Sequence, residues 1–155
     1  MVILFNKFQK TLKFHFRSSP IVVRYGETDQ MGVVHHSNYL RYFEVARLEW
    51  LTQLGISYNT MESSGVMMPV FHAQIEYKFP ACFEDALVVE IYLREVPMVK
   101  MIFDYRVTNQ RDELICTAST TLAFMRADNR RPIRCPKEFQ TVFSTVVSTG
   151  GVDGG

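Results

Sequence analysis

The sequence of 155 residues has few cysteines, no long apolar run and almost no excess of one charge. Its three cysteines, Cys82, Cys116 and Cys135, are widely spaced and form no CxxC pair, so a zinc or redox site has little support. No apolar run approaches the roughly 20 residues that a membrane-spanning helix needs. The net charge of +1, from 17 basic and 16 acidic side chains, provides no overall field for nucleic acid or an anionic membrane. These absences predict a cytoplasmic protein with free thiols, no membrane span and no nucleic-acid partner.

The motifs of several enzyme classes are also missing. The sequence has no GxSxG motif of a serine hydrolase, no GxxxxGK phosphate-binding loop, no GxGxxG after a strand and no HExxH zinc motif. His35 and His36 are adjacent, and two neighbours cannot point the same way in a regular element, so they make a poor metal pair. We therefore expect neither a metal nor a bound cofactor.

Length and composition predict one globular domain. With 47% hydrophobic and 21% charged residues, the chain can bury an ordinary core. Residues 1–16, in which basic and aromatic side chains alternate, are interpreted as an N-terminal extension. Residues 144–155 are small, polar and rich in glycine, which predicts a flexible C-terminal tail. The predicted domain therefore spans residues 17–143.

The first half of this domain predicts a strand, a loop and a long helix. Residues 20–25 contain a β-branched run, and residues 26–32 have the composition of a loop. Ser37 or Asn38 can cap the start of a helix, and Gly55 can end it. The apolar residues between them cover more than one face, so we expect this helix to be buried on most sides.

The second half predicts four β-strands. The β-rich, roughly alternating runs lie at residues 70–79, 86–96, 100–110 and 114–127. Short breaks between them favour an antiparallel meander, in which sequential strands are neighbours. One helix packed on one antiparallel sheet gives an α+β fold. On the helix, Glu44 and Arg47 lie three residues apart, which is a spacing that allows an ion pair.

The segment YGETDQMGVVHHSNY, between the strand and the helix, contains the best candidate for chemistry. Asp29 lies in its loop, and Gly32 permits close approach of the backbone to a ligand. Main-chain amides at Gly32, Val33 and Val34 can point outward at the start of a helical turn and receive an oxyanion. A carboxylate and such donors are the two parts that acyl transfer from a thioester needs. The alternative is that Asp29 only holds a turn, as aspartate often does.

A longer stretch, VRYGETDQMGVVHHSNYLRYFEVARLEWL, resembles the signature of the YbgC/4-hydroxybenzoyl-CoA thioesterase branch of the hotdog superfamily. The matching positions, in order, are Asp29, Gly32, Val33, Val34, His36, Asn38, Tyr39, Phe43, Glu44, Ala46 and Arg47. The later segment IEYKFPACFEDALVVE is similar to the strand, proline, turn and strand that follow the central helix in this family. The resemblance covers residues 20–140.

This resemblance implies a hotdog fold, in which a long central helix is wrapped by a curved antiparallel β-sheet. It implies a homodimer with one continuous sheet, often stacked as a dimer of dimers into a homotetramer, with acyl-CoA lying across the dimer interface. It gives Asp29 the role of general base on water or of direct nucleophile, with backbone amides polarising the thioester carbonyl.

The same resemblance suggests further site residues. His36 matches a histidine near the thioester and is expected to orient water or the carbonyl, with a bond to the backbone as the alternative. Tyr25 and Tyr39 are candidates for the acyl pocket, with core packing as the alternative. The guanidinium group of arginine can donate two parallel hydrogen bonds, which suits it to the phosphates of CoA. The alternative is that a cluster of arginines simply forms a solvated basic face. The preferred arginines are Arg126, Arg130, Arg131 and Arg134, and the other candidates are Lys78, Arg94 and Lys100.

The resulting functional prediction is hydrolysis of acyl-CoA thioesters to free acid and CoA. Coenzyme A is then part of the substrate, and no separate cofactor is expected. An acyl-carrier-protein thioester is an alternative substrate. Two other functions remain open at this point, namely a non-catalytic acyl-CoA-binding module and a hotdog dehydratase that acts on hydroxyacyl thioesters.

Overall fold

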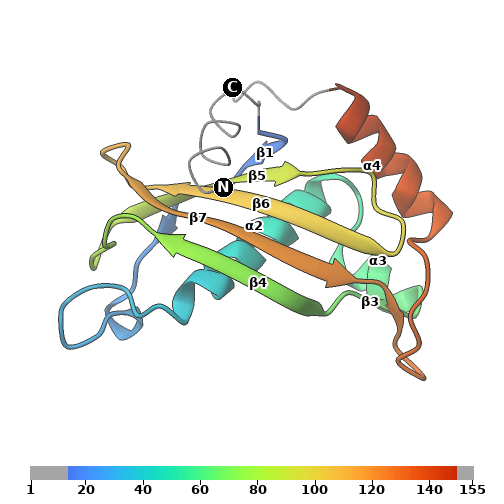
Figure 1. Cartoon of the computed structure of the whole chain (residues 1–155), viewed down its shortest axis with the longest axis horizontal. Coiled ribbons are helices and arrows are strands. Elements are labelled where there is room, and N and C mark those ends of the chain that lie inside the picture. The colour runs from blue at the N-terminus through green and yellow to red at the C-terminus, as the bar shows by residue number, and fades with distance from the viewer. Residues whose placement is uncertain (1–13, 150–155) are drawn as a thin grey trace.

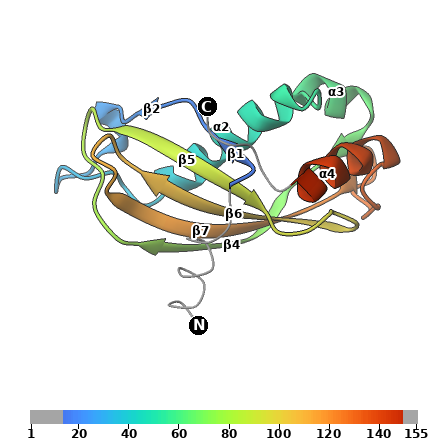
Figure 2. The same ribbon diagram turned by 90° about the horizontal axis from the view of Figure 1, so that it is seen from above.

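The structure, a computed structural model, describes residues 14–149 as a six-stranded antiparallel sheet with helices on one face, and a small two-stranded sheet of β3 and β8 (Figures 1 and 2). The elements in chain order are β1 (Phe16–Arg17), β2 (Ile21–Val22), η1 (Tyr25–Glu27), α2 (Asn38–Gln53), α3 (Tyr58–Ser63), β3 (Val66–Met67), β4 (Val70–Tyr77), β5 (Ala86–Leu93), β6 (Lys100–Thr108), β7 (Leu114–Ala123), β8 (Met125–Arg126) and α4 (Lys137–Thr149). Figure 2 shows α2, α3 and α4 on the same side of the sheet, which curves around α2. Within these residues, no helix is long and apolar enough to span a membrane.

The strand order differs from the predicted meander. The main sheet has the order β1-β5-β6-β7-β4, and β2 also pairs with β5, so β4 lies beside β7 and not beside its successor β5. Residues 78–85 must therefore cross the end of the sheet to connect β4 with β5. The crossing starts where the N–H groups of Lys78 and Phe79 both donate to the carbonyl of Ile115, at 2.8 and 3.1 Å. This crossover segment supports the candidate site.

Helix α2 buries one side and exposes the other, which corrects the expectation that it is buried on most sides. Its inner side packs on the sheet, where the ring of Phe43 stacks on that of Tyr105 with centroids 4.4 Å apart. The outer side carries Leu40, Val45 and Leu48, which are 42%, 49% and 40% exposed. The apolar composition is as predicted, but nothing among residues 14–149 covers this outer stripe. An apolar helix face left uncovered indicates an interaction surface.

The predicted ion pair between Glu44 and Arg47 is not formed in the described residues. Glu44 lies on the exposed side of α2, whereas Arg47 is buried on the sheet side. Arg47 instead donates from Nη1 to the hydroxyl of Tyr105, at 2.9 Å, and that hydroxyl lies 2.6 Å from Oγ1 of Thr120. Three polar groups from α2, β6 and β7 thus satisfy one another inside the core.

Both ends of the predicted domain fall inside regular elements. Phe16 is buried in β1, opposite Ile91 of β5, so ordered structure begins before the predicted boundary at residue 17. Helix α4 runs to Thr149 and therefore includes the first part of the predicted tail. Its apolar residues recur at helical spacing, and Phe143 packs 6.4 Å from the ring of Trp50, which holds the helix on the core. The remaining parts of the extension and the tail, residues 1–13 and 150–155, lie outside the described residues.

The buried polar cluster gives a prediction about stability. We expect Tyr105→Phe to lower the free energy of unfolding by about 1–3 kcal/mol, because Arg47 and Thr120 each lose a buried partner. The matched control is Tyr92→Phe, since Tyr92 is also buried but its hydroxyl has no hydrogen bond within residues 14–149. Urea denaturation of both variants measures the difference, and equal losses would contradict the network.

Candidate active site

Residues 28–34 form a tight hairpin that precedes α2, on the left in Figure 1. Thr28 bridges Val34, and the N–H of Asp29 donates to the carbonyl of Val33 at 2.9 Å. The turn closes with a 3.0 Å hydrogen bond from the N–H of Gly32 to the carbonyl of Asp29. Gly32 has a φ of 79°, a left-handed conformation that strains other residues. The glycine predicted for close approach to a ligand is thus required by the turn itself.

The side chain of Asp29 both holds this turn and keeps one oxygen unoccupied. Its Oδ1 accepts a 2.8 Å hydrogen bond from the N–H of Met31, so the structural alternative considered for this residue is present. The carboxylate is only half-buried, and its Oδ2 has no hydrogen-bond or ion-pair partner in the described part of the chain. Holding a turn and contacting a ligand therefore do not exclude each other here.

The hairpin is anchored on the crossover segment. The N–H of Val34 donates to the carbonyl of Ala81 at 2.8 Å, and Val33 bridges Cys82. Cys82 is held in turn by the buried carboxylate of Asp85, whose Oδ2 accepts from its N–H at 2.8 Å. The position of Asp29 therefore depends on a part of the chain more than fifty residues away, which no local pattern in the sequence indicates.

The three amides predicted as oxyanion donors are not available as a group. The N–H of Gly32 closes the turn, and the N–H of Val34 is bonded to the crossover. The carbonyl of Val33 accepts from Asp29 across the hairpin. In an extended strand the N–H and the carbonyl of one residue point to the same side, so the N–H of Val33 also faces Asp29. The correction arises because the segment is a hairpin and not the beginning of a helical turn. The N–H of His36, just before α2, makes no hydrogen bond within residues 14–149.

The two histidines lie side by side, in a segment that is not a regular element. The rings of His35 and His36 have centroids 4.1 Å apart, which is possible because both residues lie in the irregular turn before α2. His35 Nδ1 is 2.8 Å from Oγ of Ser37. The ring of His36 is exposed and has no hydrogen bond in the described residues, so its role near a carbonyl stays a prediction. No cluster of three or more possible metal ligands occurs in residues 14–149.

A buried carboxylate that the sequence did not single out lies two residues before Asp29. Glu27 accepts hydrogen bonds at Oε1 from the N–H of Arg24, at 2.8 Å, and from the hydroxyl of Tyr42, at 3.0 Å. Its carbonyl accepts from Nδ2 of Asn38 at 2.9 Å, so Asn38 ties the loop to α2 and does not cap the helix. The N-cap residue is Ser37, which makes no side-chain capping bond. Glu27 lies inside the stretch that resembles the family signature, but it is not among the matching positions named above.

The two tyrosines proposed for the acyl pocket occupy different environments. Tyr39 is 3% exposed and packs against the rings of Tyr42 and Tyr77, and burial raises the pKa of its hydroxyl to about 12. Core packing, the alternative reading, therefore describes Tyr39. Tyr25 is 78% exposed and meets Phe83 of the crossover edge to face, with centroids 5.7 Å apart. Tyr25 alone remains a candidate for contact with substrate.

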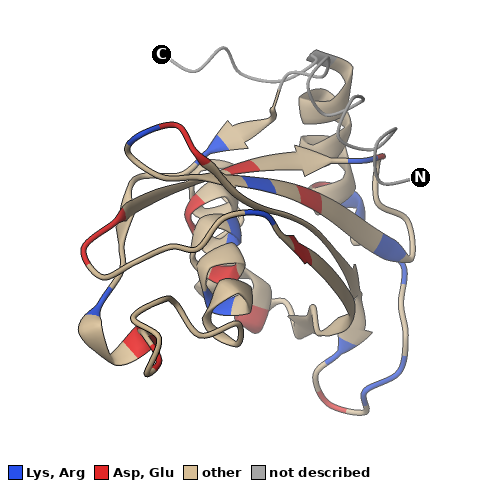
Figure 3. Cartoon of the chain, turned by 60° about the vertical axis from the view of Figure 1, so that its left-hand side comes forward, with Lys and Arg blue, Asp and Glu red and all other residues tan. Residues whose placement is uncertain are grey.

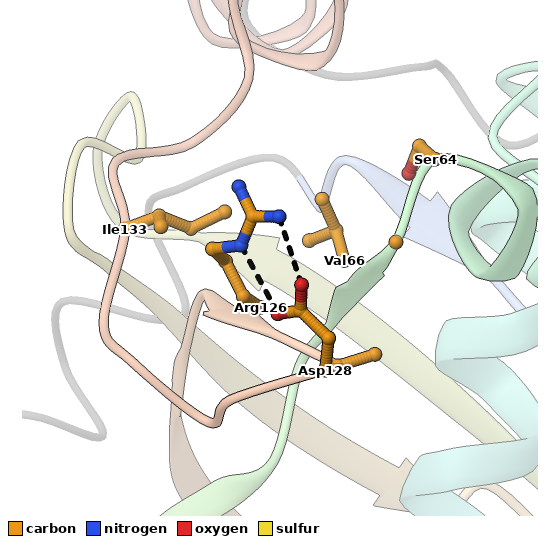
Figure 4. A pocket seen from close by; sticks show the side chains of 7 residues that line it. Ser64, Val66, Arg126, Asp128 and Ile133 are labelled. Atoms are coloured by element: carbon orange, nitrogen blue, oxygen red, sulfur yellow. Dashed lines mark hydrogen bonds and ion pairs between the residues drawn. The ribbon is translucent and has the colours of Figure 1, made fainter.

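The arginines predicted for the CoA phosphates lie at the other end of the sheet from the hairpin (Figure 1). Arg126 makes two hydrogen bonds of 3.1 and 3.0 Å to the carboxylate of Asp128 (Figure 4). Beside this pair is a cavity of about 420 Å³ lined by residues 64–66, 126–128 and Ile133. Basic and acidic positions are interspersed over the ribbon (Figure 3). Within one chain, the predicted carboxylate and the predicted phosphate site do not meet.

One antiparallel sheet curved around a long helix, with a carboxylate in the loop that leads into that helix, defines a hotdog-type thioesterase domain. Residues 23–143 match the family model of the thioesterase-like superfamily. The chain belongs to this family and is a thioester hydrolase, which confirms the predicted YbgC-type branch, fold and enzyme class.

Three relatives illustrate the match. The chain is 35% identical over 125 residues to the putative acyl-CoA thioesterase YneP of Bacillus subtilis, covering 81% of this chain and 91% of the relative. It is 33% identical over 128 residues to the acyl-CoA thioesterase YbgC of Haemophilus influenzae, covering 81% and 93%. The crystal structure of a DHNA-CoA thioesterase from Staphylococcus aureus is similar with a TM-score of 0.82 and 32% identity, covering 88% and 97%.

The hairpin gives a second prediction about stability. We expect Gly32→Ala to lower the free energy of unfolding by about 1–2 kcal/mol, because its positive φ disfavours any side chain although the space around it is open. Gly26→Ala is the control, since Gly26 also has open space but no positive φ. Chemical denaturation of the two variants compares them. Equal stability of the Gly32→Ala and Gly26→Ala variants would show that the turn does not require a glycine at position 32.

Proposed function

We propose that the protein hydrolyses acyl-CoA thioesters to the free acid and CoA, with Asp29 at the reacting centre. The observation that supports this role most directly is the unoccupied Oδ2 of Asp29, on a hairpin fixed next to the start of α2. The relatives named as acyl-CoA thioesterases support the substrate class. Their names also favour hydrolysis over a non-catalytic binding module or a dehydratase.

In this proposal a water oxygen or Asp29 itself attacks the thioester carbonyl carbon. If water attacks, Oδ2 accepts its proton as the new C–O bond forms. If the carboxylate attacks, an acyl anhydride forms and water then hydrolyses it. In both routes the C–S bond breaks and CoA leaves as the thiolate. The N–H of His36, at the positive end of the α2 dipole, is the proposed donor to the carbonyl oxygen, in place of the three amides of the hairpin.

The acyl group of the substrate is left open between aliphatic and aromatic types. Two relatives carry the general name of acyl-CoA thioesterase, and the Staphylococcus aureus relative acts by name on DHNA-CoA. Whether CoA or an acyl-carrier protein delivers the acyl group also stays open. A panel of acyl-CoA substrates with both acyl types distinguishes these possibilities most directly.

We also propose that two chains form a homodimer through the free edge of β4 and the outer stripe of α2. Strand β4 is the last strand of its sheet, and residues on both of its faces are exposed, including Phe71 and Tyr77. A long exposed edge with apolar side chains is an aggregation hazard unless another strand covers it. A two-fold axis at this edge covers β4 and buries the exposed residues of α2 at the same time.

This dimer brings together the two parts of the site that one chain keeps apart. Antiparallel pairing of two β4 strands sets the Val70 end of one chain beside the Tyr77 end of the other. The segment 126–134, which holds the four arginines, lies near the Val70 end, and the Asp29 hairpin lies near the Tyr77 end (Figure 1). The arginine cluster of one chain then lies beside the Asp29 hairpin of the other chain. A CoA bound at that hairpin can then place its phosphates on these arginines. Stacking of two dimers into a tetramer and a cytoplasmic location stay predictions from the sequence.

The role of Asp29 is tested by Asp29→Asn. The amide oxygen of asparagine can still accept from the N–H of Met31, so the hairpin and the melting temperature should be retained. We expect kcat to fall by about two orders of magnitude or more, because the variant can neither take a proton nor attack. Release of free thiol from the acyl-CoA panel measures the rate.

A folded Asp29→Asn protein with full turnover would remove Asp29 from the mechanism. If the wild type is active and the variant is not, a single turnover in ¹⁸O-labelled water separates the two routes. Label found in the Asp29 carboxylate indicates direct attack, with water opening the anhydride at the Asp29 carboxyl carbon. Label found only in the released acid fits a general base and also an anhydride opened at its acyl carbon, and trapping the acyl group with hydroxylamine separates these two cases.

The dimer is tested by Ala73→Pro. The N–H of Lys78 donates to Ile115 of β7, so by alternation along an antiparallel strand the N–H of Ala73 points to the free edge. Proline at this position leaves the pairing with β7 intact but removes a donor that a second β4 would use. We expect a shift from dimer to monomer in light scattering, whereas Ala73→Ser should remain dimeric. A dimeric Ala73→Pro variant would place the interface elsewhere.

A further inference from the structure

We infer that Glu27 is a positioning residue for the reaction, holding the Asp29 hairpin in a fixed relation to the start of α2. This inference rests on the proposed function, because it assigns Glu27 a role only through Asp29 and the main chain at His36. Glu27 does not itself face the substrate in this scheme. Its side chain is buried and already occupied by donors from this chain.

The first step of the inference concerns the side chain. A buried carboxylate is destabilising unless hydrogen bonds satisfy it. Oε1 of Glu27 accepts from the N–H of Arg24, before η1, and from the hydroxyl of Tyr42, in the second turn of α2. Tyr42 is itself buried, and burial together with the nearby carboxylate raises the pKa of its hydroxyl, which therefore stays a donor. One oxygen atom thus links the segment before the hairpin to the helix after it.

The second step concerns the main chain of the same residue. The carbonyl of Glu27 accepts from the N–H of His35 and from Nδ2 of Asn38, both at 2.9 Å. His35 is the residue at which the chain leaves the hairpin, and Asn38 is the first residue of α2. Glu27 therefore closes the base of the hairpin and joins that base to the helix.

The third step places the proposed reacting groups relative to this clamp. Asp29 lies two residues after Glu27 in one arm, and His36 lies one residue after His35 in the other. The carboxylate and the proposed N–H donor therefore extend from the two sides of one hydrogen-bonded junction. A displacement of about 1 Å between reacting groups can lower a rate by about 100-fold. Loss of the clamp should thus reduce kcat much more than substrate binding.

The test compares Glu27→Ala with Glu27→Gln. We expect Glu27→Ala to lower kcat by about 100-fold with KM changed less than about threefold, because the groups that react are misplaced while the remaining contacts to the substrate persist. Glu27→Gln should restore kcat to within about fivefold of the wild type, because its amide oxygen can accept from both Arg24 and Tyr42. The charge lost to the exposed Arg24 side chain contributes little.

The control is Asp104→Asn, which changes another buried carboxylate. Asp104 lies on β6 and accepts two hydrogen bonds from Arg94, at 3.1 and 2.7 Å, with no bond to the hairpin or to α2. We expect its melting temperature to fall and its kcat to remain that of the wild type. If Asp104→Asn and Glu27→Ala lose kcat equally, or if folded Glu27→Ala keeps kcat, the positioning role is wrong.

If Glu27→Ala does not fold, the Tyr42→Phe variant alone tests the positioning role of Glu27. This variant keeps the buried ring and removes only one donor to Glu27, so we expect a fall in kcat of about 3- to 10-fold at constant KM. Unchanged kcat in Tyr42→Phe overturns the inference. Failure of the proposed function has a different signature, since the wild type itself would then release no thiol from any acyl-CoA.

Discussion

The hydrogen bond from the N–H of Val34 to the carbonyl of Ala81 joins two parts of the chain that no local preference brings together. It exists because β4 pairs with β7 at the far edge of the sheet, so the chain must cross the sheet end to reach β5. The crossing segment then offers main-chain groups to the hairpin that carries Asp29. The strand order of the sheet thus fixes the candidate site, although the site residues themselves lie before every long strand.

The same strand order leaves the outer side of β4 without a partner and explains why α2 is only half covered. The inner face of α2 packs on the sheet, where Phe43 stacks on Tyr105. The outer residues of α2, such as Val45 and Leu48, remain exposed. The proposed two-fold contact would cover both the unpaired strand edge and the apolar outer side of the helix.

The sequence predicted elements well where a residue pattern alone determines them. The long helix and the four strands follow from periodicity, and the order of matched residues around Asp29 was specific enough to predict the fold family. The prediction was wrong where the answer depends on distant partners. Sequential strands were assumed to be neighbours, but β4 pairs with β7. Glu44 and Arg47 have the spacing of an ion pair, yet the sheet draws Arg47 inward to Tyr105.

The prediction that the hairpin amides bind an oxyanion was wrong for a related reason. A run such as Gly32-Val33-Val34 before a helix suggests free N–H groups, but each N–H in an antiparallel hairpin faces either the other arm or a neighbouring segment. The N–H of His36 lies where the hairpin has ended and α2 has not begun, and it makes no hydrogen bond within residues 14–149. Local sequence indicates that a turn is present, whereas the hydrogen-bond partners decide which donors remain for a ligand.

Glu27 and Asp29 show how the same chemical group takes two roles within three residues. Both are carboxylates in one loop, and residue type does not separate them. Oε1 of Glu27 is filled by donors from Arg24 and Tyr42, so this group can hold structure but has no capacity left for a reaction. Asp29 uses one oxygen for its turn and leaves the other unpaired. A carboxylate that acts on water must keep such an incomplete set of partners, whereas one that holds a loop to a helix needs its donors in place.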